Sequence, residues 1–280
     1  MRLLHLLLGC GLLGLATATR AGDAADRIVF PEQASQGAMV LGKVPAGSIV
    51  SYAGRILRVT PYGTVGFGIG RDATGPLSID VQEPDGSHRI ARIEVSTRDW
   101  PIERVSGVPP KTVDPPPQIA ARIRREQSAV AAARERDDAR TDFTETFIRP
   151  LEGRISGRFG NQRIYDGKPG SAHSGMDIAA PRGTPVKAPA SGIVSFAADD
   201  LYLTGGTLVI DHGHGFSSNF LHLSRLDAKV GERVEQGQVI VPVGASGRAS
   251  GPHLHWGMNW FDVRIDPQQV LDAANHSISH

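Results

Sequence analysis

The histidines of this chain are concentrated in its C-terminal half, and two of them stand two residues apart. Six of the ten histidines fall between His173 and His255. His253 and His255 belong to a strand-like run, so both rings should project from the same face of a sheet. Neutral imidazoles side by side suit a metal centre, because each offers a ring nitrogen as a ligand.

Two further segments supply partners for this pair. His173-Ser-Gly-Met-Asp177 adds an imidazole and a carboxylate, and His222 lies within Phe220-Leu-His-Leu-Ser224. The sequence contains no His-Glu-x-x-His, no Gly-x-Ser-x-Gly and no cysteine after Cys10. Helix-borne zinc proteases, serine hydrolase elbows and cysteine nucleophiles are therefore disfavoured. Any metal bound by the rest of the chain must be held by histidines and carboxylates.

At these residues the chain resembles the LytM/lysostaphin-type zinc endopeptidases, which cut peptide cross-links of bacterial peptidoglycan. The resemblance covers about residues 157–271. Besides the two segments above, it rests on Leu208-Val-Ile-Asp-His-Gly213, the glycine-punctuated hairpin at 230–240 and Ser250-Gly-Pro-His-Leu-His255. Phe220 replaces a common tyrosine, and Gly257 replaces a common acidic residue. Because neither position is a ligand, these departures bear on specificity or packing.

The resemblance implies a role for each residue of the set. His173, Asp177 and His255 are expected to bind one Zn²⁺ and to leave a fourth position for water. His222 and His253 are expected to be catalytic without binding the metal. Zinc would lower the pKa of the water towards ~7, one imidazole would accept its proton and the other would stabilise the oxyanion. Which ring does which stays open, and Tyr165 is a further candidate for the site.

Two other functions remain to be distinguished from an endopeptidase of peptidoglycan peptides. A non-catalytic relative of the same fold could activate a cell-wall amidase, but such proteins typically lack zinc ligands. The hairpin at 230–240 is also similar to those of carrier and phosphotransfer domains, but no carrier lysine stands in the required context. A second His-x-His pair, His212 and His214, alternates with glycine, so we expect a turn or surface role for it.

The elements that must position these residues are mainly β. Short apolar runs separated by glycines predict an antiparallel β peptidase domain at 143–280, similar to a duplicated hybrid motif. Residues 22–107 have the alternation and turn spacing of a small immunoglobulin-like β-sandwich, with Asp85-Gly86 as a hairpin turn. Five prolines within 108–117 predict an extended linker. The linker leads to a connecting helix from Gln118 towards Arg140, and this intermediate region ends at residue 142.

The first residues resemble a signal for export. Arg2 precedes an apolar stretch from Leu3 to Leu15, and small residues follow, so 1–21 is predicted to be a cleaved signal peptide. About 13 apolar residues are too few to span a bilayer core of ~30 Å. Lipidation at Cys10 is the weaker interpretation. We therefore expect an exported protein of the periplasm or cell envelope without a transmembrane segment, and the net charge of +1 offers no surface for nucleic acid.

Overall fold

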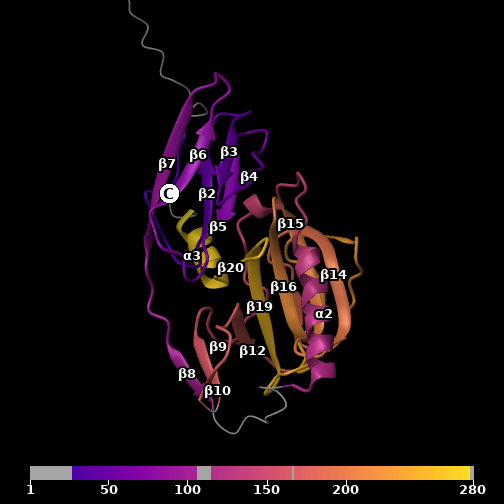
Figure 1. The fold of residues 1–280 in the computed structure, drawn as a ribbon. Helices are drawn as coiled ribbons and strands as arrows, with labels where there is room; N and C mark the ends of the chain where they lie inside the picture. Colours follow the sequence, from indigo (N-terminus) through magenta and orange to yellow (C-terminus); the bar gives the residue numbers. More distant parts are fainter. Residues whose placement is uncertain (1–26, 106–114, 166, 278–280) are drawn as a thin grey trace, which may run out of the picture.

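The computed structural model describes residues 27–105, 115–165 and 167–277. The expected signal peptide and most of the proline-rich linker lie outside these residues. The described chain is mainly β with several antiparallel sheets, as the sequence predicts (Figure 1). Within it, no helix is both long enough and apolar enough to cross a membrane.

The N-terminal region contains a five-stranded sheet and a two-stranded sheet. Asp85-Gly86 forms the expected hairpin turn, and Gly86 has the positive φ of 86° that this turn requires. The immunoglobulin-like identity of the region stays a prediction. In spatial order the larger sheet is β1 (Gln33–Ser35), β7 (His88–Ser96), β6 (Leu77–Gln82), β3 (Ile49–Tyr52) and β4 (Arg55–Leu57), and the smaller is β2 (Met39–Lys43) with β5 (Thr64–Gly68).

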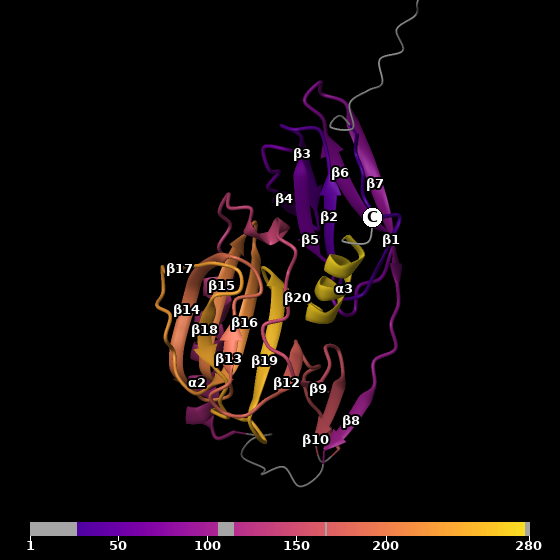
Figure 2. The ribbon, with the colours of Figure 1, turned by 180° about the vertical axis from the view of Figure 1, so that it is seen from behind.

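The C-terminal region is built on one large antiparallel sheet, and a two-stranded sheet, β13 (Pro185–Lys187) with β18 (Val239–Pro242), accompanies it (Figure 2). The helix α3 (Pro267–Ser277) follows the last strand. The order of the large sheet is β17 (Arg233–Val234), β14 (Gly192–Leu201), β15 (Gly205–Gly213), β16 (Phe216–Leu223), β19 (His253–Trp260), β12 (Met176–Ala179) and β9 (Arg154–Gly157), with β20 (Val263–Ile265) paired to β19.

The connecting helix, α2 (Pro117–Arg134), begins where the prolines predict. It packs against β14 and β15, and Glu126 accepts a 2.8 Å hydrogen bond from the backbone of Tyr202. Figure 1 shows α2 lying over this part of the sheet. The expectation that the helix continues to Arg140 is wrong, because the chain turns after Arg134 into an ionic network.

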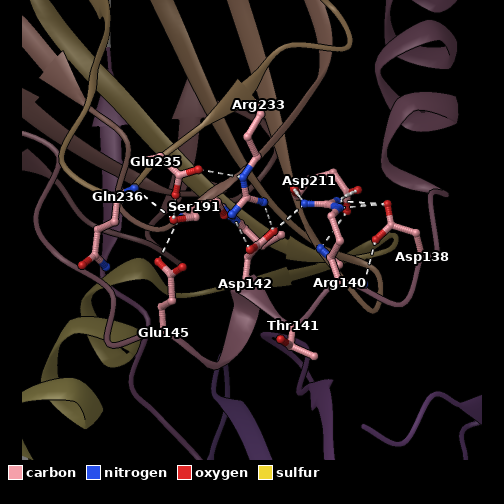
Figure 3. A network of polar contacts seen from close by, with 12 residues as sticks. Asp138, Arg140, Thr141, Asp142, Glu145, Ser191, Asp211, Arg233, Glu235 and Gln236 are labelled. Atoms are coloured by element: carbon pink, nitrogen blue, oxygen red, sulfur yellow. Dashed lines mark hydrogen bonds and ion pairs between the residues drawn. The ribbon is translucent and has the colours of Figure 1, made fainter. Parts of the chain in front are cut away.

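That network ties residues 136–145 to the edge of the large sheet (Figure 3). Asp142, which belongs to the short 3₁₀ helix η2 (Asp142–Thr144), accepts bonds of 2.8 and 2.9 Å from the guanidinium of Arg233 and one of 2.5 Å from Arg140. Arg140 also bonds the buried carboxylate of Asp211. Because the chain turns here, Arg140 and Asp142 reach their charged hydrogen-bond partners, which they could not do if the helix continued.

The two regions are joined by packing and by strand pairing. Trp260 of β19 lies against Phe67 and Tyr52 of the N-terminal region, with ring centroids 6.4 and 5.9 Å apart. The strand β8 (Ile102–Val105) pairs in parallel with β10 (Gln162–Tyr165), which continues to β11 (Lys168–Pro169). Buried residues of both regions therefore form one hydrophobic core. The division of the chain at 107 and 142 stays a prediction.

Candidate metal centre and active site

Three of the predicted residues meet at one point. Asp177 of β12 lies directly opposite His255 of β19 in the antiparallel pairing, so their side chains share a face. His173 reaches them from the loop before β12. His173 Nε2 lies 3.1 Å from Asp177 Oδ1 and 3.1 Å from His255 Nδ1, and His255 Nδ1 lies 2.8 Å from Asp177 Oδ1. All three residues are buried.

The hydrogen bonds around this triangle define which atoms carry lone pairs. His173 Nδ1 lies 3.0 Å from the carbonyl oxygen of Arg158, which can only accept, so Nδ1 carries the proton and Nε2 of the neutral ring has a lone pair. That lone pair faces a carboxylate oxygen. Two acceptors at 3.1 Å repel each other unless a cation, either a proton or a metal ion, lies between them.

Burial and hydrogen bonding set the charge of the group. Burial alone would raise the pKa of Asp177, but its close contacts with the rings of His173 and His255 hold it well below its usual range. Burial also lowers the pKa of His255 to about 4. At neutral pH Asp177 is thus a carboxylate and His255 a neutral imidazole, the forms that bind metal ions.

These residues fit a zinc ion. Two ligand atoms at ~2.0–2.1 Å from a tetrahedral zinc are separated by roughly 3.3 Å, and the three edges here measure 2.8 to 3.1 Å. The carbonyl of Arg158 holds the ring of His173 as metal-binding histidines are commonly held, through the nitrogen that does not bind the metal. A two-histidine, one-carboxylate set also leaves a coordination position open.

His253 and His222 flank this triangle. Their rings lie 4.8 Å apart, and His253 Nε2 is 3.9 Å from Asp177 Oδ1. Each ring is fixed through Nδ1, which donates to the carbonyl of Gly251 at 2.8 Å for His253 and of Ser246 at 2.9 Å for His222. Both rings therefore keep their Nε2 atoms as lone-pair acceptors when neutral. Burial lowers the pKa of His222, which favours its neutral form.

A backbone irregularity turns His222 towards the site. By strand alternation, His222 would point to the same face as the buried Phe220, away from Leu221, which pairs with His255. Its φ of +63° is left-handed, which is uncommon for a residue with a side chain. The pairing with β15 shifts register at the same point. As a result His222 and Leu221 line the same pocket.

The pocket has a wall that the sequence did not predict. Its volume is about 830 Å³, and it extends from His173, His222 and His255 to the inner side of α2. Arg134 of α2 and Arg264 of β20 contribute to it. Arg163, which forms an ion pair with Asp177 at 3.7 Å, also lines the pocket. The sequence predicts only a connecting helix here, and it does not indicate that the helix borders the site.

The remaining candidates have other positions. The expected surface role of His212 is wrong: it lies in β15, is fully buried, and contacts the carbonyl of Ser191 at 2.7 Å and the hydroxyl of Ser218 at 2.9 Å. His214 is in a turn with φ of 51°, as expected, but is buried beside Phe143. The side chain of Tyr165 is outside the described part.

Comparisons with known proteins identify the family of the region that contains these residues. The sequence profile described as "Peptidase family M23" matches residues 171–267. The peptidoglycan DD-endopeptidases ShyC and ShyA of Vibrio cholerae are 38% and 39% identical over 130 and 121 residues, 45% and 43% of this chain. The matches span only 30% and 27% of those longer proteins.

The similarity to one solved structure extends beyond residues 171–267. A crystal structure of a candidate M23 peptidase from Pseudomonas aeruginosa is 30% identical and superimposes with a TM-score of 0.68. The match covers 85% of this chain and 95% of that one, so it includes elements outside residues 171–267. The chain therefore belongs to peptidase family M23.

Proposed function

We propose that this chain is an exported zinc endopeptidase that hydrolyses peptide cross-links of bacterial peptidoglycan. The observation that carries the proposal is the triangle of His173 Nε2, Asp177 Oδ1 and His255 Nδ1, with two more imidazoles beside it. The substrate class is supported by relatives named peptidoglycan DD-endopeptidases. Export is supported by the sequence of residues 1–21.

The five residues divide into ligands and catalysts. His173, Asp177 and His255 would hold one Zn²⁺, which supplies a water molecule of lowered pKa and polarises the peptide carbonyl. His222 and His253 are not assigned to the metal because their ring nitrogens lie outside the group of ligand atoms that His173, Asp177 and His255 form. One of these Nε2 atoms would accept a proton from the attacking water and return it to the leaving amine, and the other, protonated from solvent, would donate to the oxyanion.

The direct test is digestion of isolated sacculi by the purified protein. We expect soluble muropeptides to appear, elemental analysis to find one zinc per chain, and a chelator such as phenanthroline to stop digestion until zinc is restored. Active protein without stoichiometric metal would contradict the ligand assignment.

The same experiment separates the alternative function. A non-catalytic activator would release no fragments by itself but would accelerate digestion by a cell-wall amidase. With all five residues in place, we expect the opposite result: fragments with the chain alone, with cleaved peptide bonds and intact amide bonds to the glycan.

A further inference from the structure

Two arginines from distant parts of the chain line the pocket beyond the metal triangle. Arg134 lies in the last turn of α2 and Arg264 lies on β20. Arg264 Nη1 donates to Asn259 Oδ1 at 2.7 Å. Arg134 Nε is buried and has no hydrogen-bond partner among the described residues. Within that part of the chain, no carboxylate lies within ion-pair distance of either guanidinium.

This arrangement is unfavourable for the empty protein. Burial, assisted by the charge of Arg134, lowers the pKa of Arg264 to about 9, so it is still protonated at neutral pH. Burial also lowers the pKa of Arg134, and the attraction of Glu135 and Asp262 offsets this only in part. Buried charges are normally paired, because an unpaired one loses its hydration without compensation. Two neighbouring cations without a carboxylate at ion-pair distance therefore favour an anion in the pocket.

One face of β19 connects Arg264 to the triangle of His173, Asp177 and His255. His255, Gly257 and Asn259 alternate on one face of β19, and Asn259 Nδ2 donates to Asn219 Oδ1 at 2.9 Å. Gly257 adds no side chain to this face, and a Cβ there would lie 2.6 Å from Nδ2 of Asn219, which lines the pocket. The four residue-to-residue steps from His255 to Asn259 correspond to roughly 13 Å of strand. An extended peptide covers that span with about four residues.

Resting on the proposed function, we propose that Arg134 and Arg264 form a subsite for a carboxylate of the stem peptide, about three to four residues from the cleaved bond. The planar, multiply donating guanidinium suits a carboxylate. A glutamate linked through its γ-carboxyl keeps a free α-carboxylate at such a distance from the cross-link. The subsite would select acidic stems over amidated ones.

The test uses the full chain and two synthetic cross-linked peptides that differ in one group. One peptide carries isoglutamate and the other isoglutamine. For wild type we expect kcat/KM to favour the isoglutamate peptide by a factor on the order of ten or more, as charged hydrogen bonds allow. In Arg134→Gln and in Arg264→Gln this ratio should fall towards one.

Arg134→Gln is the decisive variant, because Arg134 has no hydrogen-bond partner to lose. Removing a half-buried charge that has no ion-pair partner should leave its melting temperature equal to or above that of wild type. Arg125→Gln is the matched control, since Arg125 is exposed on the same helix; it should keep the wild-type ratio. An equal rate on both peptides in wild type, or an unchanged ratio in Arg134→Gln, would overturn the subsite. So would equal loss of cleavage of both peptides.

Binding measured by calorimetry separates the subsite from the proposed function. Preferential binding of the isoglutamate peptide without hydrolysis would retain the subsite and refute the endopeptidase. Hydrolysis of both peptides at equal rates would do the reverse. Binding of neither peptide refutes the subsite directly.

Discussion

His222 combines a strained backbone with a fixed ring. Its φ of +63° brings the ring to the face of the metal triangle, and the carbonyl of Ser246 then sets its tautomer. Such a conformation costs about 1–3 kcal/mol and persists only where the surroundings impose it. Here the hydroxyl of Ser246 imposes it, because it donates to Leu223 O at 2.7 Å and accepts from Gly206 N at 2.9 Å.

This assignment predicts different behaviour for ligands and catalysts. His173→Ala and Asp177→Ala should lose zinc and activity together. His222→Ala should keep zinc near the wild-type level while sacculus digestion slows by a factor of order 10²–10⁴, the usual contribution of a positioned acid or base. His253→Ala should resemble it. Metal content and turnover of the four variants decide the matter, and loss of zinc from His222→Ala would show that this ring is a ligand.

The lowered pKa of another histidine, His212, predicts how the free energy of unfolding depends on pH. Burial lowers the pKa of His212 from 6.5 to about 4. The unfolded chain therefore takes up a proton below pH 6.5, and the folded protein does so only near pH 4. The stability contributed by neutral His212 is complete above pH 6.5 and is lost as the pH falls towards 4. The total loss is roughly 3 kcal/mol.

Urea unfolding at pH 7.5 and 4.5 measures this effect. The experiment compares wild type with His212→Asn. All other titrating groups contribute equally to the two proteins, so the difference between them reports on His212. We expect the wild type to lose more stability on acidification than the variant. Parallel losses would mean that His212 titrates normally in the fold.

At the scale of elements, the segment after α2 anchors the helix to the sheet. Figure 3 shows Asp142 between Arg140 and Arg233, and Ser191 between Glu145 and Glu235. These bonds hold one end of the segment while α2 packs on β14 and β15. The helix α2, which forms one wall of the pocket, is therefore held both by its own packing on the sheet and by the ionic network of the segment that follows it.

Removing the central acid should weaken this anchor. Asp142→Asn loses the charge that accepts from two arginines, and the side chain of Asp142 is only 11% exposed. We expect the free energy of unfolding to fall by about 1–3 kcal/mol. Asp227→Asn is the control, because its pair with Arg225 is 46% and 70% exposed. It should cost less than about 0.5 kcal/mol, and equal effects would argue against the anchor.

At the scale of the whole molecule, the N-terminal sheets cover part of the C-terminal core. Phe67 and Tyr52 pack on Trp260, and a Cβ at Gly66 would lie 2.9 Å from Phe216 and 3.1 Å from Phe143. Contacts this close leave no room for solvent between the two regions. The C-terminal region thus depends on the N-terminal region for part of its burial.

A fragment that begins at residue 142 tests this dependence. The metal triangle lies wholly within it, so we expect the fragment to fold and to bind zinc. It should nevertheless unfold at a lower temperature than the full chain, because Trp260 and Phe216 lose apolar cover. Calorimetry of both proteins gives the comparison, and equal melting temperatures would show that the shared core contributes little.

Local patterns predicted much of the strand content and the set of residues that meet. Same-face placement of His253 and His255 follows from their spacing, and the start of α2 follows from the prolines. The end of α2 at Arg134 could not be predicted, because it depends on ion pairs with Asp211, far along the chain. Nor could the left-handed turn at His222, since a register shift between two strands produces it.

The pairing of β12 with β19 has a consequence for folding fidelity. Asp177 faces His255, and a slip by a single residue would put Ile178 opposite that histidine and send the carboxylate to the other side of the sheet. A divalent ion that binds both side chains therefore stabilises this register of the two strands and no other. During refolding, such an ion would stabilise chains in which the two strands have paired in the native register. Strands paired in another register would bind no ion and could separate and pair again.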